Sequence, residues 1–132
     1  MEDFVPFSLA KKLKEKGFKT ENISWCYLDG KLVQLKQYIN ISPYEYAPTI
    51  SQVLKWLRKE KKIYVEPCIL ADADTDADGK VINEYTYWSF SVTHIETGDM
   101  IYFEYEHIDD KRFDSYELAA LAGIEYVIDN LI

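Results

Sequence analysis

Apolar residues recur at helical spacing in three stretches of the chain. In the middle stretch, residues 49–61, they stand at i, i+3, i+4 and i+7, the pattern of a helix that buries one face. These residues are Ile50, Val53, Leu54 and Leu57. Thr49 and Gln52 have the spacing of a capping box at its start. We therefore predict a helix over residues 49–61, and weaker patterns predict two more over residues 8–16 and 114–131.

Polar and small residues mark the ends of the other two helices. Ser8 and Asp114 have side chains suited to accept hydrogen bonds from the free N–H groups of a first helical turn. Gly17 is the residue type expected just beyond a helix end. Gly123, inside the last helix, indicates that another element approaches it closely.

Short apolar or alternating runs between these helices predict strands. Residues 23–28 and 31–35 flank Asp29-Gly30, the strongest short signal for a type I′ hairpin turn. Residues 63–70 predict a strand, and Pro67 predicts either that this strand lies at a sheet edge or that it ends near this residue. Residues 85–94 and 100–107 flank Thr97-Gly98 and predict a second hairpin.

The apolar pattern of the second hairpin also predicts its register. With Thr97-Gly98 as the turn, Val92 faces Phe103 and Phe90 faces Tyr105. One face is then apolar and consists of Trp88, Phe90, Val92, Ile101, Phe103 and Tyr105. The face towards water carries Tyr87, Ser89, Ser91, Thr93, Tyr102, Glu104 and Glu106. A shift by one residue would exchange the two faces, so this register is the one expected.

The predicted order of elements is α-β-β-α-β-β-β-α, with residues 38–48 and the acidic residues 72–79 as loops. Hairpins covered by helices form α+β folds. We therefore predict an antiparallel sheet of about five strands, from two hairpins plus a connecting strand, with the helices packed on one face. The chain has 132 residues, 48% of them hydrophobic, which predicts a single domain over residues 1–132.

Charge divides the chain into two halves of opposite sign. The formal net charge is −8, but residues 1–66 carry 12 basic and 8 acidic side chains whereas residues 67–132 carry 3 and 15. The first half is therefore at +4 and the second at −12. Such halves attract each other or present two different surfaces to partners.

Several classes of protein are disfavoured by the composition. No apolar run has the length of a transmembrane helix, and the chain starts with acids where a secretory signal carries Lys or Arg, so we expect a cytoplasmic protein. Cys26 and Cys68 form no C-x-x-C pair, and we expect them to be reduced strand residues. The sequence contains no G-x-S-x-G and no Gly-rich phosphate loop. We expect neither catalysis nor a cofactor.

The acidic segment 74–85 resembles a calcium-binding loop. Its D-x-D-x-D-G run supplies carboxylates at alternate positions followed by a bend, which suits a hard cation. The position that normally closes such a site holds Tyr85, and the flanks predict strands rather than helices. The expectation is an acidic, solvated loop without a metal, and the alternative is a weak calcium site of Asp74, Asp76, Asp78 and Glu84.

The helix over residues 49–61 predicts a basic surface. Lys55, Arg58, Lys59 and Lys62 recur at helical spacing opposite its apolar face. Trp56 stands at the border, and Tyr44 and Tyr46 precede the helix. Cationic side chains beside aromatic rings bind phosphates and stack on bases. This candidate interaction surface comprises Trp56, Lys55, Arg58, Lys59, Lys62, Tyr44 and Tyr46, and the simpler interpretation is a solvated helix face.

Two blocks of sequence are similar to a known family. The first is A-P-T-I-S-Q-V-L-K-W-L-R at residues 47–58, followed by a strand at 63–67, and the second is F-D-S-Y-E-L-A at 113–119. The chain resembles a family of small proteins from gut Bacteroides and their phages and mobile elements. It departs from that pattern in its Asp-rich insertion at 72–79 and in Lys59, where the family often has Glu. The resemblance implies a cytoplasmic accessory protein and no catalytic residues.

These observations predict a non-enzymatic module that binds a protein partner, as an inhibitor, an antitoxin-like protein or an adaptor. The acidic second half suits a basic cleft on that partner. The alternatives are contact with nucleic acid through the basic helix at 49–62 and a weak calcium-binding module at 74–85.

Overall fold

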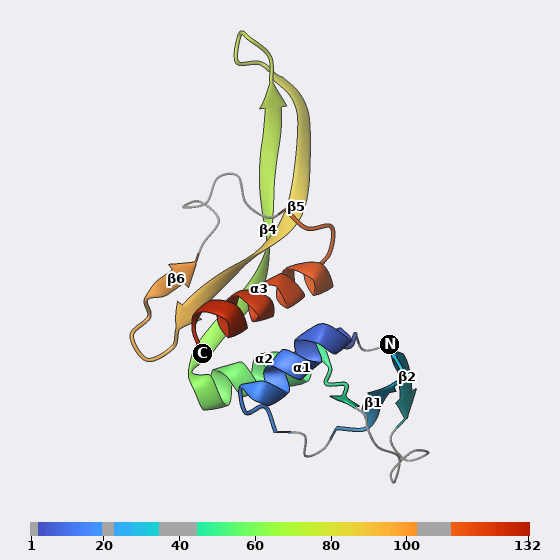
Figure 1. Ribbon diagram of the computed structural model, residues 1–132. Helices are drawn as coiled ribbons and strands as arrows, with labels where there is room; N and C mark the ends of the chain where they lie inside the picture. The colour runs from blue at the N-terminus through green and yellow to red at the C-terminus, as the bar shows by residue number, and fades with distance from the viewer. Residues whose placement is uncertain (1–2, 20–22, 35–44, 103–111) are drawn as a thin grey trace.

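The computed structural model describes residues 3–19, 23–34, 45–102 and 112–132 (Figure 1). Its helices are α1 (Phe7–Glu15), α2 (Ile50–Trp56), which continues as the π-helical turn η2 (Leu57–Lys61), and α3 (Tyr116–Asn130). Its strands are β1 (Trp25–Leu28), β2 (Lys31–Gln34), β3 (Glu45–Tyr46), β4 (Ile63–Thr75), β5 (Val81–His94) and β6 (Met100–Tyr102). The predicted α+β class is confirmed.

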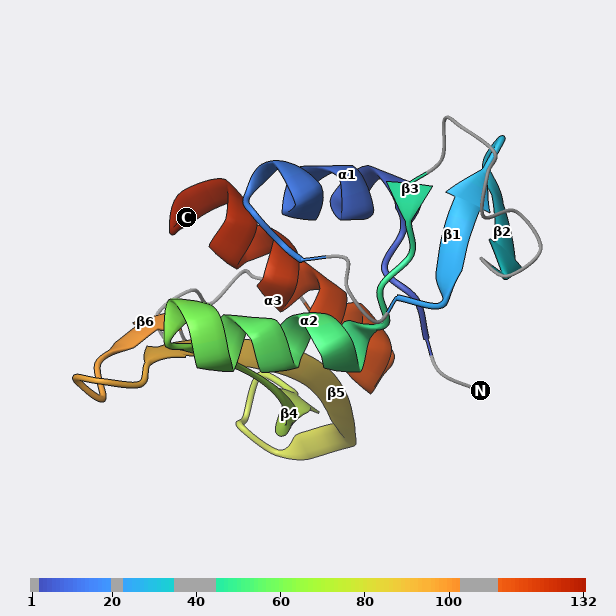
Figure 2. The ribbon, with the colours of Figure 1, turned by 90° about the horizontal axis from the view of Figure 1, so that it is seen from below.

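The strands form two antiparallel sheets, and the single sheet of about five strands is wrong. The small sheet has the order β2-β1-β3 and the large one the order β4-β5-β6. The physical reason is that the two sheets pack on different helices: β3 lies against α1, whereas β4 and β5 lie against α3. Figures 1 and 2 show the small sheet beside α1, away from β4 and β5. The short strand β3, within the predicted loop 38–48, completes the small sheet through Cys26↔Tyr46.

Helix α3 is the centre of the core because it packs on the large sheet with one side and on α1 and α2 with the other. Gly123 makes the sheet contact possible: a Cβ there would lie 2.5 Å from Cγ1 of Val65 and 3.2 Å from a ring carbon of Phe90. The predicted close approach at Gly123 is thus confirmed. The largest fully buried apolar side chains of the core are Phe90, Leu13, Leu57, Ile124, Ile128, Val5, Val53, Val92 and Val127.

Three local signals of the sequence are confirmed, and one of them is Gly17, which follows the C-cap of α1 with a positive φ of 90°. The Thr49 hydroxyl accepts from the Gln52 N–H at 3.1 Å and the Gln52 amide oxygen accepts from the Thr49 N–H at 2.8 Å, a complete capping box. Asp29 and Gly30 both have positive φ, as the type I′ turn requires.

The predicted caps of the other two helices are corrected. Helix α3 is capped by Ser115 rather than Asp114, because Ser115 is the extended residue whose hydroxyl accepts from the Leu118 N–H at 3.2 Å. Helix α1 begins at Phe7, after Pro6, and has no side-chain cap, so Ser8 lies inside the helix. The φ of −59° at Pro6 already suits a first helical turn.

The predicted register of the second hairpin is wrong. Strand β6 pairs Val92 with Tyr102 and Thr93 with Met100, with an irregularity between them, and the loop closes through the His94 N–H donating to the Asp99 carbonyl. The shift turns the Tyr102 ring inwards, where it is 5% exposed and stacks on Phe90 at 4.7 Å between centroids. Burial of this large ring favours the shifted register. The predicted partners Phe103 and Tyr105, and also Glu104 and Glu106, lie outside the described residues.

Residues that were expected on the water-facing side are buried as well. Ser89 is 1% and Ser91 5% exposed, so both faces of β5 are covered at this level. Cys26 is fully buried in β1 and Cys68 is half-buried in β4, so both cysteines lie in strands as expected.

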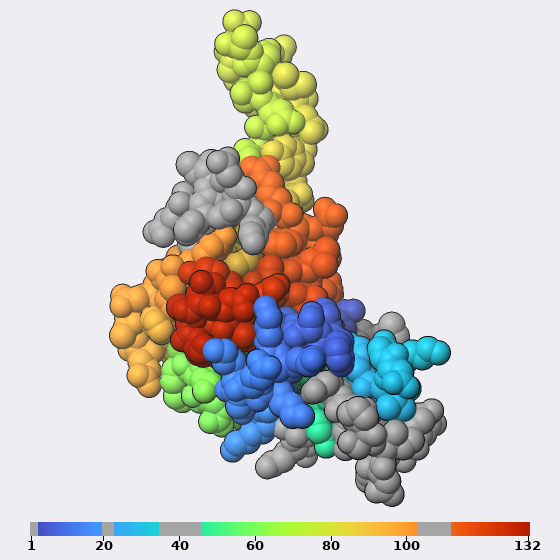
Figure 3. Space-filling view, viewed as in Figure 1, coloured from blue at the N-terminus to red at the C-terminus, as the bar shows by residue number. Residues whose placement is uncertain are grey.

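The segment 72–79, expected to be a loop, is one only from residue 76 onwards, because residues 72–75 continue strand β4. Strand β4 extends to Thr75 and β5 begins at Val81, so the paired ladder runs from Ile63↔His94 to Thr75↔Val81. Aspartate is disfavoured in strands, which is why Asp72 and Asp74 predicted a loop. Here their alternation with Ala71 and Ala73 fits a two-sided ribbon open to water. The resulting hairpin projects well beyond the body of the protein (Figures 1 and 3).

Candidate interaction surfaces

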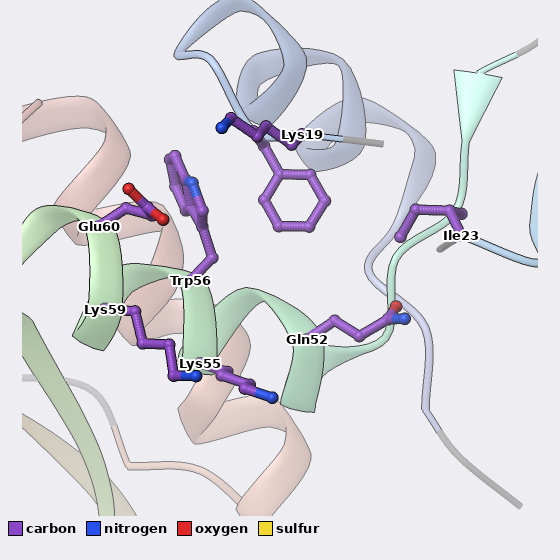
Figure 4. A pocket seen from close by; sticks show the side chains of 8 residues that line it. Lys19, Ile23, Gln52, Lys55, Trp56, Lys59 and Glu60 are labelled. Atoms are coloured by element: carbon purple, nitrogen blue, oxygen red, sulfur yellow. The ribbon is translucent and has the colours of Figure 1, made fainter. Parts of the chain in front are cut away.

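The first candidate surface is a groove of about 320 Å³ above α2 and η2 (Figure 4). We call it the basic groove, and its lining residues are Phe18, Lys19, Ile23, Gln52, Lys55, Trp56, Lys59 and Glu60. The helical segment contributes the last five and the chain that follows α1 contributes the first three. Three lysines and one glutamate give the lining a net charge of +2.

Aromatic contacts form one wall of the basic groove. The Trp56 indole meets the Phe18 ring edge-on, with 5.3 Å between centroids and 80° between planes. The Lys61 ammonium lies over the indole at 5.4 Å from its centroid. A cation and an aromatic edge therefore hold Trp56 in one orientation, while its neighbours Lys55 and Lys59 stay exposed. An apolar wall with ammonium groups at its rim suits a flat ligand that carries negative charge.

The structure brings together only part of the basic surface expected from the sequence. Lys55, Trp56 and Lys59 line the groove, but Arg58 and Lys62 do not. The helical residues that line it stand at i, i+3, i+4, i+7 and i+8 from Gln52, which is one face of a helix, and Arg58 falls outside that face. Lys62 has left-handed φ of 55° and ends the helix, so it cannot continue the stripe.

The two tyrosines do not join this surface as expected. Tyr46 is half-buried in β3 and packs against the core. Tyr44 lies outside the described residues. Sequence reasoning also missed Phe18, Lys19 and Ile23, which reach the groove only through the fold and have no spacing relation to α2.

The second candidate surface is the outer part of the β4–β5 hairpin, residues 69–86, which we call the acidic arm. It carries Asp72, Asp74, Asp76, Asp78 and Glu84 against the single cation Lys80, a net charge of −4. Three apolar side chains are also exposed on it, Ile69 at 58%, Val81 at 49% and Ile82 at 68%. The alternation A-D-A-D at residues 71–74 is a strand signal that could have predicted this extension.

The register of the arm separates the four residues of the calcium alternative. Asp74 pairs with Asn83, and Glu84 pairs with Ala73, so Asp74 and Glu84 point to opposite faces of the ribbon. The Asp76 carboxylate accepts from the N–H groups of Asp78 and Lys80, both at 2.9 Å, and thereby stabilises the turn. Within the described ranges, no three His, Cys, Asp or Glu side chains are grouped so that they could hold a metal ion.

Arg112 holds the base of the acidic arm. Its guanidinium donates to the Asp72 carboxylate at 2.7 Å and to the Tyr85 hydroxyl at 2.6 Å. It also lies over the Tyr87 ring, 4.4 Å from the centroid. The Ala73 N–H and then Arg112 lower the pKa of Asp72, and the bond to Asp72 is the main reason why the pKa of Arg112 is raised. This brace joins segments that are far apart in sequence, and no local pattern predicts it.

Comparison with known proteins adds no relationship: no family model, no curated protein and no solved structure matches this chain. In the described part of the chain, no helix has the length and apolarity needed to cross a bilayer.

Proposed function

We propose that this protein is a non-enzymatic protein-interaction module that binds a basic surface of its partner through the acidic arm. The observation that carries the proposal is the projection of residues 69–86 beyond the body of the protein, with a net charge of −4 (Figure 3). A projecting ribbon reaches into a cleft that the body cannot enter. Its charge speeds association with a basic partner and disfavours acidic ones.

The arm has the features of a preformed binding element. Pairing continues from the body to Thr75↔Val81, and Arg112 ties Asp72 and Tyr85 to the base. A segment that is ordered before binding loses less conformational entropy when it binds. The exposed Ile69, Val81 and Ile82 add apolar contact area beside the carboxylates.

A role as an inhibitor, an antitoxin-like protein or an adaptor carried by a phage or mobile element fits this kind of arm. The family resemblance of residues 47–58 and 113–119 supports that origin. The acidic arm is also the region in which this chain departs from the family pattern, so we propose that it sets the choice of partner.

The test is affinity capture of the tagged protein in its own host, with nuclease present, followed by mass spectrometry. The informative variant combines Asp74→Asn, Asp78→Asn and Glu84→Gln, which lowers the charge of the arm and spares the Asp72 brace and the Asp76 turn. The matched control combines Lys55→Gln, Arg58→Gln and Lys59→Gln on the helix. A partner retained by the control and lost by the arm variant supports the proposal, and retention by both variants contradicts it.

A second candidate function is contact with single-stranded nucleic acid in the basic groove. It is favoured by Lys19, Lys55 and Lys59 around the half-buried Trp56. Binding of a fluorescent oligonucleotide should then weaken with rising salt and fall sharply in Trp56→Ala and in the variant with both Lys55→Gln and Lys59→Gln. Binding that ignores these changes would rule the groove out.

A further inference from the structure

Strand β4 is the edge strand of the large sheet, and within the described residues no strand pairs with its outer side. An edge strand offers a row of unpaired N–H and C=O groups to another chain. In the acidic arm, alternate residues of β4 direct these groups outwards, and not all of the outward N–H groups are available.

The alternation of hydrogen-bonded pairs between β4 and β5 shows which residues of β4 face outwards. The Ile95 N–H donates to the Lys62 carbonyl at 3.0 Å, so that pair is a hydrogen-bonded one. Because such pairs alternate in antiparallel ladders, even-numbered residues of β4 face β5 and odd-numbered residues face outwards. Two contacts agree: the Ala73 N–H donates to the Asp72 carboxylate at 2.8 Å, and Trp88, opposite Ile69, exchanges both its bonds with Phe113.

Two residues limit the available edge. Pro67 has no N–H to offer, and the Ala73 N–H is already bound by Asp72. Between them, Ile69 and Ala71 present N–H and C=O groups that no described residue outside the ladder occupies. The carbonyls of Pro67 and Ala73 extend this row, so residues 67–73 form a short docking edge on the arm.

The side chains along this edge define what an added strand must carry. Ile69, Ala71 and Ala73 share one face of the ribbon, while Leu70, Asp72 and Asp74 share the other. A strand beside them therefore places every second side chain next to Ile and Ala and the remaining ones next to Leu70, Asp74 and Asp72, whose carboxylate already accepts from Arg112. Charge complementarity selects Lys or Arg for the second set and aliphatic residues for the first.

We propose that the acidic arm recognises its partner by strand addition, in which an extended segment with alternating aliphatic and basic residues pairs with Ile69 and Ala71. The inference rests on the proposed function and names the class of ligand that the arm binds. Pairing with a second copy of this chain is disfavoured, because it would bring two arms of net charge −4 together.

The experiment uses a synthetic peptide of alternating valine and lysine and a control peptide of the same composition with the residues in blocks. The alternating peptide should bind the full chain about tenfold or more tightly than the block peptide, and should shift the amide resonances of Ile69 and Ala71 in NMR spectra. Methylation of the peptide N–H groups on its pairing edge should remove this advantage while leaving the protein unchanged. The arm-charge variant, which combines Asp74→Asn, Asp78→Asn and Glu84→Gln, should bind both peptides more weakly.

A protein variant provides an independent test. Ala71→Pro removes an outward N–H and leaves every hydrogen bond of the β4–β5 ladder in place. It should therefore lower the affinity for the alternating peptide about tenfold and leave the affinity for the block peptide unchanged. Circular dichroism checks that the variant folds. If it does not fold, the N-methylated peptide still tests the pairing, because it is measured with the unchanged protein.

The outcomes separate the two proposals. Equal affinity for both peptides, lost in the arm-charge variant, would overturn strand addition and leave the acidic docking surface intact. Binding of neither peptide would overturn strand addition, while the capture experiment would still judge the proposed function. Sedimentation would also reveal a dimer of this chain. If Ala71→Pro dissociates such a dimer, the edge binds a second copy, and the proposal of an alternating aliphatic and basic segment as its ligand is overturned.

Discussion

Arg112 and Asp72 form an ion pair at 2.7 Å although 40 positions separate them in the chain. The same guanidinium donates to Tyr85 at 2.6 Å and covers the ring of Tyr87. One cation thus contacts both strands of the hairpin at the point where it leaves the body. The acidic arm is a continuation of the sheet whose base is held from the side.

Replacing Arg112 by alanine should loosen the arm without unfolding the protein. The bonds to Asp72 and Tyr85 are at the surface and exposed, so their loss should act locally. Amide hydrogen exchange should become faster in residues 72–87 and stay unchanged in α3. Arg58→Ala, at another exposed arginine, on η2, is the matched control. Unchanged exchange in the arm of the Arg112 variant would show that pairing alone keeps it ordered.

The same brace predicts a pH dependence of the arm. The Ala73 N–H and Arg112 lower the pKa of Asp72 below the ordinary value of an aspartate. A lowered folded pKa means that the stabilisation is fully present above the ordinary pKa and is lost as pH falls through the folded one. Exchange in the arm should therefore accelerate only in strongly acidic solution, below about pH 4. In Asp72→Asn this step should disappear, and a step that persists would assign it to another carboxylate.

Gly123→Ala should destabilise the fold, although alanine normally favours a helix by about 1 kcal/mol. The added Cβ would lie 2.5 Å from Cγ1 of Val65, so α3 would have to move away from the sheet. Overpacking of this kind costs about 1–3 kcal/mol of unfolding free energy, measurable by urea denaturation. Adding Val65→Ala removes the clashing methyl group, so the two changes together should cost less than the sum of the single costs. Additive costs would refute the clash.

Thr49→Ala should destabilise the protein by about 1 kcal/mol, because it removes the acceptor for the Gln52 N–H. The bond is part-buried, so the freed Gln52 N–H is not simply returned to water. The control is Ser51→Ala, two positions on and exposed. Urea denaturation of both variants checks the prediction, and equal effects would mean that the capping box contributes nothing specific.

The basic groove illustrates which part of a site can be predicted from sequence. Lys55, Trp56 and Lys59 follow from helical spacing because residues three or four apart share a face. Arg58 is absent because the lining residues of the helical segment stand at i, i+3, i+4, i+7 and i+8 from Gln52, and position 58 falls outside that face. Lys62 is absent because it ends the helix with a left-handed φ. Phe18 and Lys19 enter it from a segment whose position depends on the packing of α1, and no pattern within α2 indicates them.

The sequence by itself determined the elements that depend on a few neighbouring residues. The capping box at Thr49 and Gln52, the turn at Asp29-Gly30 and the close approach at Gly123 are of this kind, because each depends on backbone angles, hydrogen bonds or space at one position. Only the tertiary structure decided the separation into two sheets, the register that buries Tyr102 on Phe90, and the extension of the acidic arm. These depend on which distant surfaces exclude water together and on the contact of Arg112 with Asp72. Long-range burial and pairing therefore overrule the local preference of aspartate for loops.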